Sequence, residues 1–310
     1  MFMKQSLKNM FQGKGILVTG GTGSIGSEIV RQLIPYRPKF IRVYSRDESK
    51  HYFLEQELNK INHAKNVMRY LIGDTRDKER LNRAFQEVDI VFHAAALKHV
   101  PYCEYNPFEA IKTNVHGTQN VVDLALLHNI SKVIAISTDK AVYPNTVMGI
   151  TKLLMERIII SSQNFIGDTK TKFAVVRFGN VLMSRGSVIP TWIEQIQNGG
   201  PVTVTDKNMT RFFMSIPDAV NLVFLATSHM KGGEIFVLKM PERNMYDLAK
   251  ETIQKYAGGK RIAVKFIGRR EKEKFHERLY TDEEQEFLIN KDKFYIIKPS
   301  RDIFVKRREQ

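Results

Sequence analysis

Short apolar runs rich in β-branched residues alternate along the chain with stretches that carry apolar residues at helical spacing. Five of the apolar runs predict buried parallel strands: GILVTG, FIRVYS, VDIVFHAAA, KVIAIST and FAVVRFGNV. After the first of them, Ile25, Ile29 and Leu33 fall on one face of a predicted helix. This alternation predicts an α/β fold, a Rossmann-type doubly wound parallel sheet.

The regular alternation ends at Gly179, and the pattern beyond it predicts a smaller C-terminal lobe. A predicted helix near Thr191 to Asn198 precedes the turn and strand GGPVTV, while IPDAVNLVFLATSHM and GEIFVLK predict a further helix and strand. We therefore assign the chain to two parts: a cofactor-binding domain of residues 1–178, to which 212–240 return, and a substrate-binding lobe of 179–211 and 241–310.

The composition limits where this fold works and what it binds. The chain has 310 residues, a formal net charge of +15 and one cysteine, so an internal disulfide is excluded and we expect a reducing, cytoplasmic setting. No apolar run approaches the ~20 residues of a membrane span, and the start lacks a signal-peptide core. Basic residues alternate with acids, as in RREKEKFHER, which favours a solvated surface over binding to nucleic acid or a membrane.

The glycine-rich stretch TGGTGSIG comes at the end of the first predicted strand. Its glycines let the backbone turn tightly and approach a pyrophosphate at the N-terminus of the next helix, where free N–H groups and the helix dipole favour anions. The stretch therefore predicts a dinucleotide site that includes Gly20, Thr22, Gly23, Ser24, Ile25 and Gly26.

Ser45 and Arg46 end the second predicted strand, where an NAD-binding fold usually has an acid. A hydroxyl and a guanidinium suit the 2′-phosphate of NADP, which an acid would repel. Alternatively, Arg46 is a surface residue and Asp47 contacts the ribose. In GDTRD, Asp74 ends a further strand and fits an adenine contact. We expect NADP as the cofactor, with further contacts from Thr75, Ala94, Ala95 and Ala96.

The stretch ISTDKAVYPNTVMGITK carries the candidate catalytic residues. Extended short-chain dehydrogenases normally follow a strand ending in Ser or Thr with Tyr-x-x-x-Lys on a helix, an interval that puts both side chains on one face. Lys152 is present, whereas Met148 takes the place of the tyrosine. A thioether cannot accept a proton from a sugar hydroxyl, so either another group is the base or the chain is inactive.

Together these motifs resemble those of the UDP-N-acetylglucosamine 4,6-dehydratases, the branch of the short-chain dehydrogenase superfamily that makes capsule and flagellin sugars. The resemblance rests on TGGTGSIGSE, YSRDE, HAAALKHVP, NVHGTQNV, STDKAV, MGITK, RFGNVLMSRGSVIP and TRFFM. Some members of that family have methionine at the tyrosine position and are active. The chain resembles a soluble member, because it lacks the membrane spans of the large anchored ones. We also expect a homo-oligomer.

The resemblance implies a reaction on UDP-N-acetylglucosamine. NADP⁺ would take the C4 hydride, a base would take the C5 proton as water leaves from C6, and the hydride would return to C6. The family has Asp139 as the acid and Lys140 as the base, and burial would have to raise the pKa of the first and lower the pKa of the second. Alternatively, the two residues form a strand-end salt bridge or a helix cap.

Several groups could accept the proton of the sugar 4-hydroxyl. The candidates are Asp139, Lys140, Lys152 and a water relayed by Thr138. We expect Lys152 to orient the nicotinamide ribose. Tyr143 is close to Met148 in sequence, but related enzymes often have a tyrosine there in addition to the catalytic one.

HAAALKHVPYCE places Lys98 and His99 at the crevice where open α/β sheets bind ligands. The resemblance implies that Lys98 lies near the cofactor or the sugar and that His99 lines the pocket; a solvated loop pair is the alternative. The resemblance also implies that uridine and diphosphate are held by Asn180 and the SRGSVIP run, with Val188 and Ile189.

Two further motifs carry arginine, whose guanidinium fork matches phosphate oxygens. They are TRFFM, with Arg211, and RREKEKFHE, with Arg270 and Glu273, and we expect these residues at the diphosphate and ribose. In the second motif, Glu271 and Lys272 replace the Pro and Gly that the family usually has, which changes the expected backbone shape of the loop.

Two other functions fit parts of the pattern. A UDP-sugar 4-epimerase would also oxidise C4, but epimerisation needs no C5 base, which disfavours it given Lys140. A catalytically silent NADP-sensing protein would explain the missing tyrosine, but Lys152 and the intact STDK disfavour it. His, Cys, Asp and Glu do not cluster at metal-ligand spacing, so we expect no metal.

Overall fold

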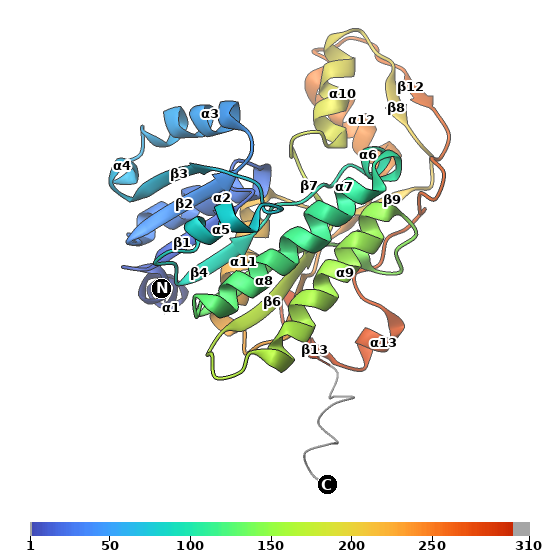
Figure 1. Ribbon diagram of the computed structural model, residues 1–310. Coiled ribbons are helices and arrows are strands. Elements are labelled where there is room, and N and C mark those ends of the chain that lie inside the picture. The colour runs from blue at the N-terminus through green and yellow to red at the C-terminus, as the bar shows by residue number, and fades with distance from the viewer. Residues whose placement is uncertain (1, 300–310) are drawn as a thin grey trace.

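The larger lobe is built around one sheet (Figure 1). The computed structural model describes residues 2–299, within which nine strands pair in the order β13-β14-β10-β6-β5-β4-β1-β2-β3. The parallel strands are β1 (Gly15–Thr19), β2 (Phe40–Ser45), β3 (Met68–Ile72), β4 (Ile90–His93), β5 (Lys132–Thr138), β6 (Lys172–Phe178) and β10 (Glu234–Leu238). The order from β3 to β6 confirms the predicted Rossmann-type doubly wound sheet.

Alternate residues of each strand face two different cores, because successive side chains point to opposite faces of a sheet. On one face, Ile16 and Val18 pack with α1 (Phe2–Phe11), α2 (Ser24–Leu33) and α11 (Ile216–His229). On the other, Leu17 packs with α5 (Lys78–Ala84), α8 (Gly117–Leu127) and α9 (Val147–Ser161). Burial on both faces explains why the strands read as continuous apolar runs.

The smaller lobe has its own core around the fully buried Trp192. It contains α10 (Val188–Gln197), α12 (Met245–Tyr256), and the paired strands β8 (Val202–Val204) and β12 (Val264–Phe266). A second small sheet joins it to the larger lobe, with β9 (Thr210–Met214) between β7 (Asn180–Val181) and β11 (Glu242–Asn244). The helix predicted near Thr191 begins earlier, at Val188.

The C-terminal segment differs from the sequence-based division. Residues 212–240 supply α11 and β10 to the larger lobe. Residues 288–297, which the sequence placed in the smaller lobe, supply two further strands to the sheet of the larger one. β14 (Phe294–Ile297) pairs antiparallel with β10 and with β13 (Leu288–Asn290). These strands are short and follow a charged stretch, so their pattern carries little signal. Residues 300–310 of the assigned lobe lie outside the described residues.

The remaining elements connect these parts. They are η1 (Ile34–Tyr36), α3 (Glu48–Leu58), α4 (Ala64–Val67), α6 (Val100–Tyr105), α7 (Pro107–Ala110), η2 (Ile111–His116), η3 (Asp139–Ala141), η4 (Ser162–Phe165) and α13 (Asp282–Gln285). In the part of the chain that the structure describes, none of the helices combines the length and apolarity that a bilayer crossing requires.

A buried ion-pair network ties α13 to the sheet. Arg177 of β6 is fully buried and donates to Glu156 of α9 from Nε at 3.1 Å and from Nη2 at 2.6 Å. It also donates to Glu284 of α13, at 2.8 and 2.9 Å. Burial alone would lower the pKa of Arg177, but the two carboxylates raise it above its ordinary value. The guanidinium therefore stays charged and holds α9 and α13 together.

Candidate active site

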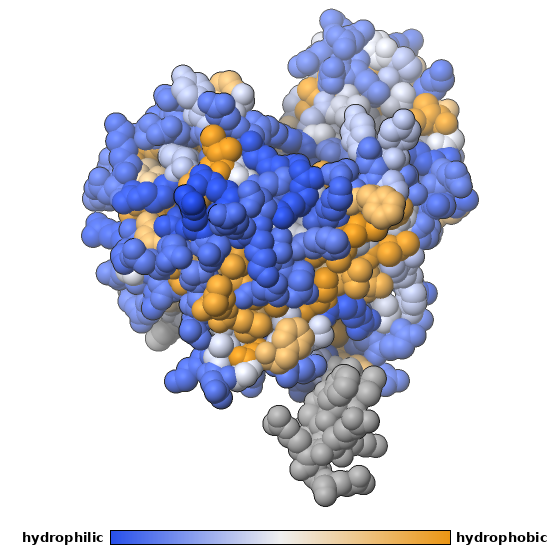
Figure 2. Space-filling view, viewed as in Figure 1, coloured by the Kyte–Doolittle hydropathy of each residue, from blue (hydrophilic) through white to orange (hydrophobic). Residues whose placement is uncertain are grey.

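A cavity of about 850 Å³ opens between the two lobes, where the surface in Figure 2 is hollowed. The carboxyl ends of the parallel strands meet there: Gly20 follows β1, Ala94 follows β4, and Thr138 ends β5. Ligands of open α/β sheets bind at this edge. Every residue that the sequence assigned to the cofactor, the substrate or catalysis lines the cavity, with the exception of Asp139.

The glycine turn leaves room for a dinucleotide. Gly20 has a φ of 65°, and a Cβ there would lie 2.6 Å from the Ala95 nitrogen. A Cβ on Gly26 would lie 2.3 Å from the Gly20 carbonyl oxygen. Gly23 precedes the first turn of α2 and supplies no side-chain cap, so that turn presents backbone N–H groups to the cavity. This geometry fits a pyrophosphate.

The polar groups at the end of β2 fit a phosphorylated ribose. Ser45 Oγ lies 2.8 Å from Thr22 Oγ1, and the half-exposed Arg46 guanidinium lies 3.4 Å from the Asp74 carboxylate. Asp47, the alternative ribose ligand, has its two carboxylate oxygens bonded to the backbone N–H and ammonium of Lys50 at the start of α3. Lys50 also lines the cavity, so this end of the cavity carries two cations, Arg46 and Lys50, each paired with a carboxylate.

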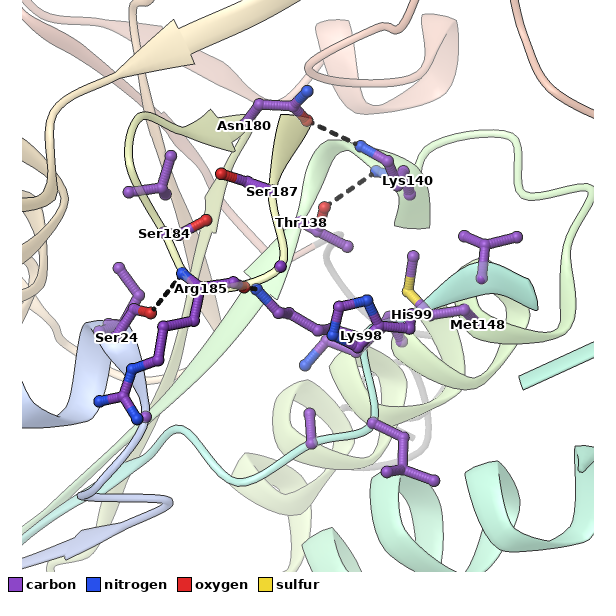
Figure 3. Close-up of a pocket in the computed structure, with 18 of the residues that line it drawn as sticks. Ser24, Lys98, His99, Thr138, Lys140, Met148, Asn180, Ser184, Arg185 and Ser187 are labelled. Atoms are coloured by element: carbon purple, nitrogen blue, oxygen red, sulfur yellow. Dashed lines mark hydrogen bonds between the residues drawn. The ribbon is translucent and has the colours of Figure 1, made fainter. Parts of the chain in front are cut away.

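Lys140 reaches into the cavity from the turn after β5 (Figure 3). Its Nζ donates to Asp139 Oδ1 at 3.0 Å and to Asn180 Oδ1 at 3.1 Å. Asp139 is fully buried, and its Oδ1 also accepts from the Thr138 hydroxyl at 2.9 Å, whereas Oδ2 has no hydrogen-bond partner among the described residues. Thr138 Oγ1 accepts from the Lys140 N–H, so the salt bridge and the helix cap considered above are both present.

Met148 and Lys152 lie on one face of α9 and are both buried. Met148 packs with Cys103 and Ala110 and forms part of the cavity wall. Burial lowers the pKa of Lys152 to about 8, although Glu156 opposes this shift. The Tyr143 hydroxyl donates to the Asp282 carboxylate at 3.0 Å, so this tyrosine points towards α13 and does not replace the missing phenol.

Residues 184–187 cross from the smaller lobe to the glycine turn. They belong to the SRGSVIP run, which we expected at uridine and diphosphate, but Arg185 contacts the glycine turn. Its Nη2 donates to the Thr22 carbonyl at 2.9 Å, and its backbone N–H donates to Ser24 Oγ at 3.1 Å (Figure 3). Lys98 Nζ donates to the Arg185 carbonyl at 2.9 Å. Gly186, at a φ of 69°, packs so closely that a Cβ would lie 2.6 Å from His99 Cε1. The segment thus joins the predicted cofactor and substrate sites.

Arg211 holds the RREKEKFHE loop against the cavity. Its guanidinium donates to the carbonyls of Phe275 and Lys274 at 3.0 and 2.9 Å, which engages much of the fork that we expected to bind phosphate. Lys272 occupies the position where the UDP-N-acetylglucosamine 4,6-dehydratases usually have glycine. Its φ of 60° lies in the left-handed region that glycine favours. Arg270 is exposed, and its backbone N–H donates to Glu273 at 3.2 Å.

Glu277, which no motif argument singled out, is also part of the wall. Its side chain is buried beside Lys140 and Lys274. Glu277 ends the RREKEKFHE motif, but it is far from Lys140 in sequence, so the sequence alone could not predict that the two side chains lie together. The expectation that the site holds no metal stays a prediction; within residues 2–299 no group of three His, Cys, Asp or Glu side chains could hold one.

Comparison with known proteins identifies relatives along almost the whole chain. The family model described as polysaccharide biosynthesis protein matches residues 16–299. An uncharacterized membrane protein of Methanocaldococcus jannaschii is 53% identical over 302 residues, which cover 96% of this chain and 89% of that protein. The UDP-N-acetylglucosamine 4,6-dehydratase (inverting) of Campylobacter jejuni is 43% identical over 293 residues, 94% of this chain and 84% of the relative.

Relatives named for another reaction are equally similar. The UDP-glucose 4-epimerase of Rickettsia typhi is 44% identical over 279 residues, which cover 89% of this chain and 80% of that protein. Among solved structures, the X-ray structure of Pen from Bacillus thuringiensis is 41% identical, covers 94% of this chain and 90% of its own, and superimposes with a TM-score of 0.90. With its doubly wound fold and a family match from residue 16 to residue 299, the chain belongs to the polysaccharide biosynthesis protein family.

Proposed function

We propose that the protein is an NADP-dependent UDP-N-acetylglucosamine 4,6-dehydratase that produces a UDP-4-keto-6-deoxy-N-acetylhexosamine for surface glycans. The observation that carries the proposal is the Lys140 ammonium, which lies in the cavity beside the buried Asp139 carboxyl. Elimination of water needs a base for C5 and an acid for the 6-hydroxyl, and these two residues supply both kinds of group. The similarity to the Campylobacter dehydratase supports the same reaction.

The cofactor would lie against the glycine turn, with its adenosine 2′-phosphate beside Ser45 and Arg46 and its nicotinamide ribose near Lys152. When bound, NADP supplies the hydride acceptor for oxidation at C4 and the same hydride for C6. The 184–187 segment would cover the pyrophosphate, because Arg185 already contacts the carbonyl of Thr22 in the glycine turn.

In the elimination step, Lys140 takes the C5 proton, the C5–H electron pair forms the C5–C6 double bond, and the C6–O bond breaks. Asp139 provides the proton that turns the leaving hydroxide into water. Because Asp139 is fully buried, we propose that Thr138 and Lys140, which contact it and line the cavity, connect it with the sugar. When the hydride returns to C6, the Lys140 ammonium gives its proton back to C5. The proton that the sugar 4-hydroxyl releases on oxidation then restores the pair, because Lys140 can pass it to Asp139 along their 3.0 Å hydrogen bond.

The uridine diphosphate would bind at the start of α10. This helix begins at Val188, and its cap residue Ser187 makes no capping hydrogen bond. Ser187 Oγ is buried without a partner among the described residues, and Ser187, Val188 and Ile189 all line the cavity, so a free hydroxyl and the first N–H groups of the helix lie close together in its wall. Phosphate oxygens satisfy both.

A 4-epimerase is the second candidate, because the Rickettsia relatives carry that name. The mass of the product formed from UDP-N-acetylglucosamine separates the candidates. Loss of one water indicates the dehydratase, and a product of unchanged mass that differs chromatographically indicates the epimerase. No turnover at saturating NADP⁺ indicates the silent sensor and contradicts the proposal.

We expect Arg46→Ala to weaken NADP binding selectively. Charge-assisted hydrogen bonds to the 2′-phosphate contribute about 1.5–3 kcal/mol, which corresponds to a roughly 10- to 150-fold rise in Kd. Isothermal titration calorimetry with NADP⁺ measures the change, and NAD⁺ with the same variant is the control, because it lacks the phosphate. Equal affinities of the wild-type protein for the two cofactors would contradict the assignment of NADP.

We expect Met148→Tyr to lower kcat or leave it unchanged. Met148 is buried against Cys103 and Ala110, so a phenol ring must displace packed neighbours at a cost of about 1–3 kcal/mol. Steady-state kinetics of the two proteins provides the measurement. If Met148 were instead a lesion in a decaying enzyme, the tyrosine would restore turnover by about 10²–10⁴-fold, the effect of a well-placed general base.

A further inference from the structure

Glu277 is a buried carboxyl group whose nearby cations lie beyond hydrogen-bond distance. Its Oε1 lies 4.0 Å from Lys140 Nζ, and its Oε2 lies 3.7 Å from Lys274 Nζ. The residue is 7% exposed, and Oε2 has no hydrogen-bond partner among the described residues. A buried carboxylate normally collects donors at hydrogen-bond distance, whereas a carboxylic acid carries less charge and tolerates their absence.

The surrounding charges are mixed. Lys140 and Asp139 face Glu277 from η3, Arg211 faces it from β9, and Lys274 belongs to its own loop. Burial raises the pKa of Glu277 above its ordinary value and Asp139 raises it further, and together they outweigh the lowering effect of the three cations. Lys274 also donates to the Val142 carbonyl at 2.7 Å, so one of these cations is already occupied.

We propose that Glu277 is a positioning residue for the elimination step, which acts as a neutral carboxylic acid beside Lys140 and keeps a second negative charge away from its ammonium group. The inference rests on the proposed function, in which Lys140 must give up a proton before it can accept one from C5. The proton moves from Lys140 Nζ to Asp139 Oδ1, and no proton is gained or lost by Glu277.

The physical reason is the direction of that transfer. Moving the proton from Lys140 to Asp139 takes positive charge away from the nitrogen that lies 4.0 Å from Glu277. An ionised Glu277 would attract the charge back and disfavour the free amine, whereas a neutral Glu277 does not oppose the transfer. Glu277 should therefore ionise as the pH rises through its raised pKa, and wild-type turnover should fall over that range.

The decisive variant is Glu277→Gln, which keeps the shape of the acid and cannot ionise. We expect its kcat near neutral pH to stay within about threefold of wild type, and the alkaline limb of its kcat profile to move to higher pH. Glu283→Gln, on the exposed face of α13, is the matched control and should leave the profile unchanged. A loss of about 10²-fold or more in Glu277→Gln would show that Glu277 itself transfers a proton, and an unshifted alkaline limb would show that its role is structural; either result overturns the proposal.

A second measurement does not depend on turnover. Infrared difference spectra between wild type and Glu277→Gln at neutral pH should contain the carbonyl band of a protonated carboxylic acid. A carboxylate band in its place would overturn the proposal even if the variant had folded poorly in the kinetic assay. Failure of the wild-type protein to release water from UDP-N-acetylglucosamine would instead contradict the proposed function, while the infrared result still reports the protonation of Glu277.

Discussion

Lys140→Ala should lower kcat by about 10²–10⁴-fold while the affinity for the UDP-sugar changes little. The variant removes the amine that lies in the cavity beside Asp139 and Asn180. Among the described residues, no other amine donates to Asp139 Oδ1 or Asn180 Oδ1. Asp139→Asn should produce a loss in the same range. The amide has nearly the same shape as the carboxyl group, and its oxygen can accept the same hydrogen bonds, but it has no acidic proton to donate. Rate measurements at saturating cofactor, together with calorimetric binding of UDP-N-acetylglucosamine, test both variants.

Lys78→Ala is the control for these two variants, because Lys78 is half-exposed on α5 and pairs with Asp123, and neither residue lines the cavity. Its turnover should match that of wild type. Lys140→Ala leaves the Asp139 carboxylate buried without its cation, so the thermal midpoint of each variant must be recorded alongside its rate. Full activity in a folded Lys140→Ala protein would remove this residue from the mechanism.

Arg177→Met should lower the free energy of unfolding by about 3–5 kcal/mol, the cost of leaving buried carboxylates without their partner. Methionine replaces the aliphatic part of the arginine but cannot neutralise Glu156, which is 1% exposed. Because Glu284 belongs to α13, the loss should also loosen the segment that carries Tyr143's partner Asp282. Urea unfolding followed by tryptophan fluorescence and circular dichroism measures the change and shows whether the two lobes unfold together.

Arg83→Met is the matched control, because Arg83 is exposed on α5. An exposed arginine contributes less than about 1 kcal/mol, so its unfolding midpoint should stay near that of wild type. If Arg177→Met lost no more than this control, the network would contribute nothing net to stability. Replacing Arg177, Glu156 and Glu284 together by apolar residues should recover part of the loss, since no unpaired charge then stays buried.

The alternating apolar runs of the sequence were enough to predict the doubly wound sheet and the edge at which its strands end in the cavity. The five predicted strands are mostly buried on both faces, so their own residues carry the signal without reference to distant parts of the chain. The same holds for the glycine turn, because the left-handed φ of Gly20 and the close approach of Gly26 are requirements of one short segment. The interval between Met148 and Lys152 likewise placed both residues on one face of α9.

Contacts between distant segments could not be predicted in this way. Arg185 meets Thr22 across 163 positions, and Glu277 meets Lys140 only because Arg211 holds the RREKEKFHE loop against β9. β13 and β14 join the sheet because β10 offers an open edge to pair with, which short apolar runs do not reveal. The charges near Lys140 were likewise only partly predictable. The sequence shows that Asp139 and Lys140 are adjacent. The burial of Asp139 and the carboxyl of Glu277 beside Lys140 depend on how the whole chain folds around them.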